Sequence, residues 1–423
     1  MNTIIIIGAG AAGLMAARTL SAMNFSVVVL EAAAVTGGRI RTLQQEPFVH
    51  PLEAGAEFVH GKLPVSLQLL KEAGIAYEPI AGSMERIVNG QPQHHDVLSE
   101  RWEELMERLQ AVQHDITVAE FLEQYFAEEQ YAGLRDAVQR FAEGYDLADI
   151  RKASVFALRE EWMNDEEEQY RLPGGYKQLI GYLEQQCIDN GCKIHTSHVV
   201  KNVEWSPQDV RVTCANGNVF TANKIIVTVS PGVLSTTEDD VAHISFKPAI
   251  ASYIEAVKKV GFGAVIKVHL LFSEAFWLSA AGEAGFFLSD ESVPTWWVQA
   301  PREYPLLTGW LGGPATNARN VNDEDSILQD AIHSLARIFN IAEDDVRKLL
   351  KASHIVNWCH EPFTKGAYSY ATIGMEQAVS LLTTPVEQTI FFAGEAVYSG
   401  AHPGTVEAAL VTGQQVAAMI AGK

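Results

Sequence analysis

The chain of 423 residues is 48% hydrophobic and 20% charged, a composition typical of a globular protein long enough for two domains. Its 52 acidic residues outnumber 31 lysines and arginines and give a net charge of −21, a surplus that is common in soluble proteins and that argues against nucleic acids and anionic membranes as partners. Because no window approaches the roughly 18 consecutive apolar residues of a membrane span and the N-terminus lacks a signal-peptide pattern, we expect a soluble cytoplasmic protein.

The first thirty residues predict the start of a dinucleotide-binding fold. Two apolar stretches, Ile4–Ile7 and Val27–Leu30, are typical of buried parallel strands, and an alanine-rich helix lies between them. Glu31 follows the second stretch, where an acidic side chain can accept hydrogen bonds from ribose hydroxyls. The order of strand, turn, helix, strand and acid is far more specific than a glycine motif alone.

The turn before this helix matches G-x-G-x-x-G. Gly8 permits the tight turn, Gly10 lets the backbone approach a pyrophosphate, and Gly13 lets the helix pack closely on the sheet. Ala12 lies in the first turn of the helix, whose free N–H groups and dipole favour phosphate binding. We therefore expect these four residues to bind a dinucleotide.

The rest of the chain alternates between helical and extended patterns. Residues Met84–Glu168 are predicted to be largely helical, and "RLPGGYKQLIGYLEQQC" predicts a further helix. Short strands follow, with a hairpin turn at Asn216–Gly217 and a buried strand at Ile225–Val229. A helix is predicted near Asp325–Phe339, and the C-terminal end predicts a buried strand, a glycine-rich loop and a long helix.

One predicted strand, Gly261–Phe272, carries a lysine in an otherwise apolar run. Because side chains alternate across a strand, one face is wholly apolar and the other holds Lys267 together with His269. This second face either meets water, which leaves Lys267 solvated, or lines a cavity. The strand by itself favours the solvated interpretation.

A second glycine motif, "GGRIRT" at Gly37–Thr42, lies beyond Glu31, and its Arg39 can neutralise a pyrophosphate. Together with the first motif and the C-terminal "FFAGE", it makes the chain similar to the flavin-containing amine oxidase family, and most similar in active-site pattern to polyamine oxidases. The family also includes monoamine oxidases, the lysine-specific histone demethylase and L-amino-acid oxidases. The resemblance runs from Ile4 to about Ile420.

The resemblance and the predicted elements imply an α/β protein in which a Rossmann-like FAD-binding domain carries an inserted α+β substrate-binding domain, a mixed sheet flanked by helices. We assign residues 1–75, 178–232 and 385–423 to the FAD-binding domain. Residues 76–177 and 233–384 then form the substrate-binding domain.

The resemblance also implies which residues hold FAD. The first glycine motif, Glu31, Gly38 and Arg39 would hold the ADP half. The segment "EAGAEFVHG" resembles the one that passes the flavin ring. The other implied contacts are Gly55 and Ala56 beside the ring, the backbone of Val200 at the adenine, Trp358 near the flavin, Gly394 and Glu395 at the ribityl-phosphate portion, and Thr405 and Val406 at the pyrimidine end.

Four residues are implied to surround the reacting amine. The strand with Lys267 resembles the family strand whose lysine holds a water near flavin N5. Tyr368 would flank the substrate, and Thr405 matches the second cage tyrosine of monoamine oxidases. His60 matches a histidine that faces the substrate in animal and fungal polyamine oxidases, and its ordinary pKa would let it hydrogen-bond an amine in either protonation state.

Departures from the family pattern narrow these expectations. Ala33 and Val35 replace two arginines of the family pattern, so we expect the ADP half of FAD to be held more weakly or by other residues. Ala367 stands where monoamine oxidases carry the cysteine that binds FAD, so we expect non-covalent FAD. The threonine at the second cage position argues against simple monoamine oxidation, and Phe58, where amino-acid oxidases carry an arginine, argues against an α-amino acid.

An acidic run at Asp165–Glu168 has two interpretations. Charge runs usually lie on solvated faces or loops, and this is the favoured interpretation. In the other, one or two of these acids point into the cleft and hold a distal ammonium, because related polyamine oxidases and the demethylase place acids in a comparable stretch.

The function that the resemblance implies is FAD-dependent oxidation of a C–N bond of a polyamine or related amine to an imine, with reduction of dioxygen to hydrogen peroxide. A monoamine oxidase, a C–C desaturase-type flavoprotein and a non-catalytic FAD-binding protein are the alternatives. The presence of His60, Lys267, Trp358 and Tyr368 disfavours the desaturase. We expect an amine and dioxygen as partners, a monomer or homodimer, and no metal, because the four cysteines lack zinc spacing.

Overall fold

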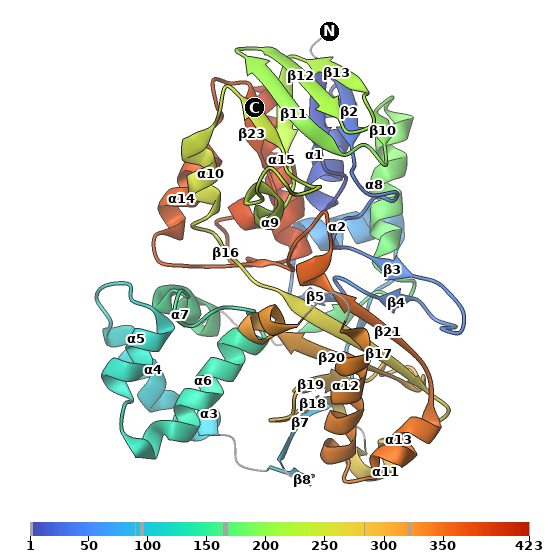
Figure 1. Cartoon of the computed structure of the whole chain (residues 1–423), viewed down its shortest axis with the longest axis vertical. Coiled ribbons are helices and arrows are strands. Elements are labelled where there is room, and N and C mark those ends of the chain that lie inside the picture. The colour runs from blue at the N-terminus through green and yellow to red at the C-terminus, as the bar shows by residue number, and fades with distance from the viewer. Residues whose placement is uncertain are drawn as a thin grey trace.

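The computed structural model has two halves, one above the other along its long axis, and both chain termini lie in the upper half (Figure 1). The chain passes between the halves several times, so that each half contains segments far apart in the sequence. The structure describes residues 3–88, 90–93, 97–163, 168–282, 284–319 and 323–422.

The upper half is built on a five-stranded sheet with the order β10-β2-β1-β14-β23, in which all strands run parallel. Apolar runs without alternation form these strands because both faces of the sheet are covered. On one face, Ile4 and Ile6 pack against Leu14 and Leu410 of two long helices. The strands are β1 (Thr3–Ile7), β2 (Ser26–Leu30), β10 (Lys193–His195), β14 (Lys224–Val227) and β23 (Ile390–Phe392), and the helices of this layer are α1 (Ala11–Ala22), α2 (Pro64–Ala73), α8 (Lys177–Asp189) and α15 (Val406–Ala421).

A four-stranded sheet with the order β13-β12-β11-β15 covers the other face. Ile5 and Ile7 of β1 meet Val203 and Val212 there. The predicted turn at Asn216–Gly217 joins two of its strands, and Gly217 adopts a positive φ of 84° that suits glycine. The strands are β11 (Val200–Ser206), β12 (Asp209–Cys214), β13 (Val219–Ala222) and β15 (Ser245–Lys247), and the nearby helices are α9 (Pro231–Leu234), α10 (Ala251–Val257) and α14 (Met375–Leu382).

The lower half contains a mixed seven-stranded sheet with the order β21-β17-β20-β19-β18-β7-β8. The wholly apolar face of its second strand, β17, packs against a long helix, where Ile266 and Leu270 meet Ile332 and Leu335. The strands are β7 (Ser83–Val88), β8 (Gln91–Pro92), β17 (Val265–Phe272), β18 (Ala284–Leu288), β19 (Thr295–Trp297), β20 (Leu306–Gly312) and β21 (Leu350–Asn357), and the helices are α11 (Leu278–Ala281), α12 (Glu324–Ile338) and α13 (Glu343–Leu349).

A group of helices with its own apolar core stands beside this sheet (Figure 1). Short strand pairs occupy the region where the two halves meet. The helices are α3 (Val97–Glu100), α4 (Trp102–Ala111), α5 (Val118–Tyr125), α6 (Ala132–Gly144) and α7 (Val155–Met163), and the short strands are β3 (Thr42–Leu43), β4 (Leu52–Glu53), β5 (Phe58–His60), β6 (Glu78–Pro79), β9 (Gln169–Arg171), β16 (Gly261–Phe262) and β22 (Ser369–Tyr370). Among all the described helices, none has both the length and the apolar character needed to cross a bilayer.

The prediction of a largely helical stretch over Met84–Glu168 is wrong at its start. Ser83–Val88 forms β7, which pairs in parallel with β18, and β8 follows it. Met84, Glu85 and Arg86 favour helices on their own, but hydrogen bonds to the neighbouring strand decide their conformation. From α3 onward the described part of this stretch is largely helical, as predicted.

The predicted strand Gly261–Phe272 is divided into β16 and β17. At Gly263, between them, an added Cβ would come within 2.4 Å of the Leu147 Cβ, and this close approach coincides with a change of strand partner from β22 to β20 and β21. All eight residues of β17 are buried, so the solvated interpretation of Lys267 is wrong.

The five parallel strands all come from the segments assigned to the FAD-binding domain, and the seven strands of the lower sheet all come from the other segments. The exact domain boundaries stay a prediction.

Candidate active site

A cavity of 3310 Å³ lies where the two halves meet. Small-molecule sites typically measure about 300–1,000 Å³, so this cavity has room for a dinucleotide and a substrate together. Apart from Gly13, it is lined by every residue that the sequence analysis assigned to a site, although the role of each stays a prediction. These are Gly8, Gly10, Ala12, Glu31, Gly38, Arg39, Gly55, Ala56, His60, Val200, Lys267, Trp358, Tyr368, Gly394, Glu395, Thr405 and Val406.

The first glycine motif forms a cradle at one end of the cavity. Gly8 has a φ of 107°, and an added Cβ there would come within 2.6 Å of the Thr228 hydroxyl. At Gly13 an added Cβ would meet the Gly8 carbonyl oxygen at 2.0 Å, so only glycine lets α1 pack this closely behind the turn. Helix α1 begins after Gly10 without a side-chain cap, and the N–H groups of its first turn are therefore available to a phosphate.

Glu31 is fixed at the end of β2 beside this cradle. Its carboxylate accepts hydrogen bonds from the backbone N–H groups of Ala9 at 2.7 Å and Ala33 at 2.8 Å. Burial raises the pKa of Glu31, and these hydrogen bonds oppose the rise. The carboxylate is thereby held at the cavity wall, in a position suited to ribose hydroxyls.

Arg39 of the second glycine motif is already paired. Its Nη1 donates to Glu395 Oε1 at 2.6 Å and to the Ala367 carbonyl oxygen at 2.7 Å. Glu395 also accepts from the backbone and hydroxyl of Ser369 through Oε2. The pair joins the N-terminal and C-terminal motifs across the cavity wall, and it leaves Arg39 less free to neutralise a pyrophosphate than the sequence alone implies.

The segment that the resemblance assigns to the flavin ring is closely packed. Trp358 Nε1 donates to the Ala54 carbonyl oxygen at 2.8 Å. At Gly55 an added Cβ would meet the Arg39 carbonyl oxygen at 1.9 Å and the Trp358 ring at 3.1 Å. Trp358 thus supports the backbone at Gly55 and Ala56, and no side chain fits between this backbone and its neighbours.

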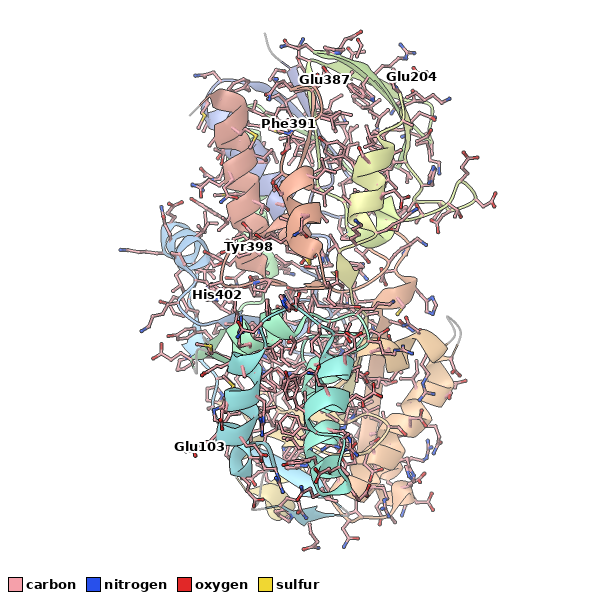
Figure 2. All side chains as sticks on the ribbon, turned by 90° about the vertical axis from the view of Figure 1, so that its left-hand side faces the viewer. Glu103, Glu204, Glu387, Phe391, Tyr398 and His402 are labelled. Atoms are coloured by element: carbon pink, nitrogen blue, oxygen red, sulfur yellow. The ribbon has the colours of Figure 1, made fainter. Side chains whose placement is uncertain are left out.

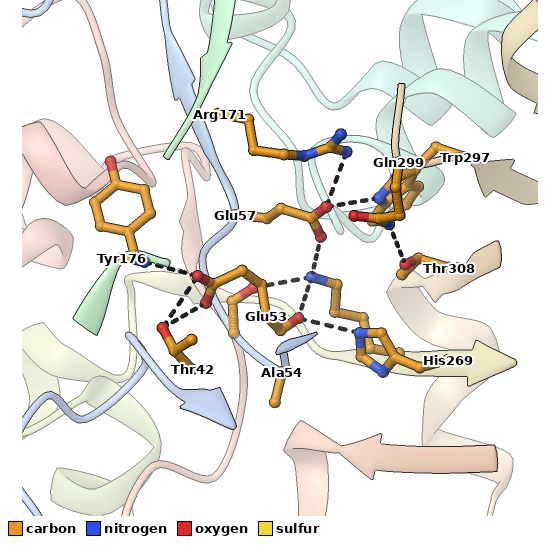
Figure 3. Close-up of polar contacts among 12 residues, drawn as sticks. Thr42, Glu53, Ala54, Glu57, Arg171, Tyr176, His269, Trp297, Gln299 and Thr308 are labelled. Carbon is orange, nitrogen blue, oxygen red and sulfur yellow. Dashed lines mark hydrogen bonds and ion pairs between the residues drawn. The ribbon is translucent and has the colours of Figure 1, made fainter. Parts of the chain in front are cut away.

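Lys267 is 1% exposed and reaches from β17 to this same segment. Its Nζ donates to the carbonyl oxygens of Glu53 at 2.6 Å and Gly55 at 3.1 Å, and to Glu57 Oε2 at 2.7 Å. Glu57 also accepts from Arg171 and Trp297, as Figure 3 shows. Burial alone would raise the pKa of Glu57, but the Lys267 and Arg171 charges lower it to about 2, so Glu57 is a carboxylate.

His269, which had no assigned role, joins the same group. Its Nε2 lies 3.1 Å from the Glu53 carbonyl oxygen. Burial, reinforced by the charge of Lys267, lowers the pKa of His269 to about 3, so the ring is neutral and donates its single proton to one carbonyl. His269 therefore helps to hold the backbone at Glu53.

His60 lines the cavity from β5. Burial, reinforced by the nearby His402, lowers the pKa of His60 to about 4. The expectation of a histidine in either protonation state is therefore corrected, since His60 is neutral at neutral pH. Its Nδ1 is buried and has no hydrogen-bond partner in the described part of the chain. His402 and Tyr398 lie where the two halves meet (Figure 2).

Aromatic rings surround the cavity near Tyr368. Its hydroxyl donates to the Tyr145 carbonyl oxygen, and its ring stacks on Trp310 with centroids 6.5 Å apart. Trp310 in turn lies 6.0 Å from Trp297, and His60 lies 6.3 Å from the Tyr145 ring. The two tryptophans had no role in the sequence analysis, because nothing in their local sequence distinguishes them from core residues.

Two acids that sequence reasoning missed lie beside Tyr368. Asp146 and Glu161 both line the cavity, and their carboxyl groups hydrogen-bond each other. Burial and the neighbouring Glu161 raise the pKa of Asp146 well above its ordinary value, so the pair retains a proton. Leu147, the residue after Asp146, has a φ of 59°, which is unusual for leucine and sets the direction of the backbone beside Asp146.

Two remaining predictions concern Thr405 and the acidic run. Thr405 caps α15, because its hydroxyl accepts from the Ala408 N–H and donates to the His402 carbonyl oxygen at 2.7 Å. Of the run Asp165–Glu168, only Glu168 lies within the described residues. The Glu168 carboxylate is exposed and accepts from the Tyr170 hydroxyl at 2.8 Å, which fits a solvated face.

A family model described as flavin containing amine oxidoreductase matches residues 11–421. The chain belongs to this family. In the described residues, no group of three or more His, Cys, Asp or Glu side chains is arranged to hold a metal ion.

Curated relatives of this amine oxidoreductase fall into two groups. Lysine-specific histone demethylase 2 of Homo sapiens is 27% identical over 99% of the chain, and the match covers 53% of that protein. Lysine-specific histone demethylase 1 homolog 3 of Arabidopsis thaliana is 26% identical, with 30% of that protein covered. Polyamine oxidase 2 of Arabidopsis thaliana is 27% identical over 98% of the chain and 87% of that protein. The chain thus spans about a third to a half of the demethylases.

Solved structures share the fold over the whole chain. Cyclohexylamine oxidase from Brevibacterium oxydans IH-35A gives a TM-score of 0.81 with 21% identity, covering 100% of this chain and 99% of that one. Putrescine oxidase bound to putrescine gives a TM-score of 0.82 with 19% identity and the same coverage. The α/β architecture of a FAD-dependent amine oxidase is confirmed.

The glycine cradle predicts that Gly13→Ala weakens flavin binding. The new Cβ displaces α1 or the turn at Gly8, and overpacking of this kind costs about 1–3 kcal/mol, so binding should weaken roughly 10-fold. Titration of the apoprotein with FAD, followed by flavin fluorescence, measures the change. Gly181→Ala in α8 is the control, because no atom lies within 4 Å of its added Cβ. Equal affinities in the two variants would contradict the prediction.

The burial of His60 predicts that its ring does not change charge between about pH 5.5 and 8, because its pKa is about 4. Histidine ring signals in an NMR titration measure this directly, and the His60→Gln variant identifies the signal by its loss. A His60 signal that titrates near its ordinary pKa would show that the ring is exposed to solvent.

Proposed function

We propose that the protein is an oxidase of di- and polyamines that binds FAD non-covalently and uses dioxygen as the electron acceptor. When bound, FAD supplies the hydride acceptor that oxidises the carbon next to the amine nitrogen to an imine, and it passes the electrons to dioxygen. Ala367 supports non-covalent binding, because the residue before Tyr368 has no thiol. Its side chain is 8% exposed and packs in the cavity wall.

The observation that carries this proposal is the pair Asp146–Glu161 beside Tyr368. In this proposal the two hydrogen-bonded carboxyl groups share one proton and keep one negative charge, and a buried carboxylate of this kind binds an ammonium group strongly. The aromatic rings of Tyr368, Trp310 and Trp297 offer faces to a cation and shelter it from water. A substrate with a second amino group at a distance from the reacting one fits such a site.

The remaining residues of the site orient the reacting end. Gly55 fixes the wall beside the proposed ring position, because its backbone packs so closely on Arg39 and Trp358 that no side chain fits between them. His60 lines the cavity with a neutral ring that can accept a hydrogen bond from an amine or donate one to it. Thr405 caps α15 and so fixes the loop before that helix at the cavity wall.

A peptide with a methylated lysine is a second candidate substrate. The demethylase relatives support it, and the cavity is also lined by Asp136, which adds negative charge for a basic peptide. The chain covers only about half of the human relative, so a peptide-binding role would rest on fewer contacts than that protein has.

The purified holoprotein should be mixed anaerobically with a panel of amines while the flavin absorbance near 450 nm is followed. We expect putrescine, spermidine or spermine to bleach the flavin faster than benzylamine or a dimethyl-lysine peptide, and admission of air to restore the colour with formation of peroxide. If the peptide or the monoamine bleaches the flavin faster than the di- and polyamines, the proposed substrate class is wrong and that compound's class takes its place. If no amine bleaches the flavin, the oxidase proposal fails in favour of a non-catalytic flavoprotein or a desaturase.

The acidic pair predicts the effect of replacing both acids by amides, in the variant Asp146→Asn/Glu161→Gln. Loss of the pair's negative charge should raise the KM for a diamine at least about 10-fold, because a desolvated charge contact with an ammonium is lost. The KM for a monoamine should change much less. Asp149→Asn is the matched control, since Asp149 lies three residues from Asp146 and pairs with Arg151 at 2.8 Å outside the cavity. A similar rise in KM for both amines would contradict the prediction.

A further inference from the structure

All the N–H groups of Lys267 are occupied by protein acceptors. An ammonium has three N–H donors, and the acceptors are the Glu53 oxygen, the Gly55 oxygen and Glu57 Oε2 at 2.6, 3.1 and 2.7 Å. The side chain is 1% exposed. A water or ligand in the cavity can therefore accept a proton from Nζ only by displacing one of these partners. In the family that the sequence resembles, this lysine instead holds a water.

Glu57 supplies the one charged acceptor of the three, and it is itself fully engaged. Its Oε1 accepts from Arg171 Nη2 at 3.0 Å and from Trp297 Nε1 at 2.9 Å, while Oε2 accepts from Lys267 (Figure 3). The side chains of Glu57 and Arg171 are 5% and 7% exposed. Glu57 is therefore not available to a substrate ammonium, although it lies at the cavity wall.

The group has two cations and one anion, and so Lys267 depends on Glu57 for its counter-charge. Without the carboxylate, two positive charges would lie buried side by side, and desolvation strongly disfavours this arrangement. The other ionisable groups facing Lys267 do not replace Glu57. His269 is neutral, and burial raises the pKa of Glu53 to about 7 while its carboxylate bonds to Thr42 and to the backbone of Tyr176.

We propose that Glu57 is the positioning residue of Lys267: it turns the ammonium away from the cavity and keeps it charged, so that the wall beside the proposed flavin ring carries a fixed positive charge instead of a lysine that holds a water. A fixed charge at this place stabilises negative charge on a reduced flavin without movement of the side chain. The proposal rests on flavin binding at this wall and is independent of which amine is the substrate.

Glu57→Gln tests the proposal, because it keeps the shape of the side chain and removes its charge. In protein labelled with ¹³C-lysine, the Lys267 signal is identified by its loss in Lys267→Met. We expect the midpoint of its pH titration to fall by at least about one pH unit in Glu57→Gln, since an opposite charge within hydrogen-bond distance shifts such equilibria by about 1–3 units. Glu57→Asp, which retains the charge, should recover most of the change.

The functional part is measured on the holoprotein after chemical reduction of the flavin with dithionite, so no amine is needed. In Glu57→Gln, the rate of reoxidation by dioxygen should fall at high pH with the same midpoint as the Lys267 signal. In Lys267→Met it should be lower by about 10-fold or more at every pH. Since Glu53 also titrates near pH 7, the comparison is made between variants and the unchanged protein at each pH.

Glu407→Gln is the matched control, because Glu407 is 1% exposed, bonds to the backbone and hydroxyl of Ser66, and does not line the cavity. It should lower the melting temperature without moving the Lys267 midpoint or the reoxidation profile. An unchanged Lys267 midpoint in Glu57→Gln overturns the proposal, and so does a changed midpoint that leaves reoxidation unaffected, since Glu57 would then be purely structural. If Glu57→Gln does not fold, Glu57→Asp decides: a smaller fall in the midpoint supports the proposal, and no fall overturns it.

Discussion

The buried ammonium of Lys267 is the constraint on which the active-site wall depends. A charge taken out of water requires acceptors for every N–H, and Lys267 finds them in two backbone carbonyls and one carboxylate of the segment Glu53–Glu57. The lysine lies on β17 of the lower sheet, whereas this segment belongs to the N-terminal part of the chain. The need to satisfy one charge thus fixes the lower sheet against the wall at which the flavin ring is proposed to lie.

A second constraint places the acidic pair. Leu147 adopts a left-handed conformation that costs leucine free energy, and it persists because Gly263 and Gly312 leave no room for another arrangement, since a Cβ on either would come within 2.4 Å of Leu147. This packing sets the direction of the chain at Asp146 and Tyr145, whose carbonyl oxygen holds the Tyr368 hydroxyl. The site therefore depends on glycines outside the cofactor motifs, and these have no signature in the sequence.

The sequence was informative where the relevant contacts are local. The glycine motif, the strands on both sides of it and Glu31 lie within thirty residues, and the backbone geometry that they require follows from the residue types. Strand alternation predicted correctly that one face of β17 is apolar, but it could not tell that Lys267 is buried. That depends on Glu57 and Arg171, which pair across 114 residues of sequence. For the same reason the strand β7, the pairing of Asp146 with Glu161 and the roles of Trp297 and Trp310 could not be predicted, because partners from distant segments decide each of them.

Two clusters of ionisable side chains, one around Lys267 and one at Asp146 and Glu161, give different parts of the cavity wall opposite charges. The cluster of Lys267, Arg171 and Glu57 has a net charge of +1, and the Glu53 carboxyl, with a pKa of about 7, leaves this charge uncompensated below that pH. The Asp146–Glu161 pair beside Tyr368 is proposed to carry one negative charge. On the proposed function, an ammonium group is therefore favoured near the acidic pair and disfavoured near Lys267, where the reacting nitrogen must lie.

Hydride loss from a carbon next to nitrogen requires the neutral amine, whose lone pair stabilises the developing cation. The charge distribution thus favours a diamine bound with its charged end at the acids and its neutral end at the flavin, so that the same two clusters select both the substrate and the bond that is oxidised.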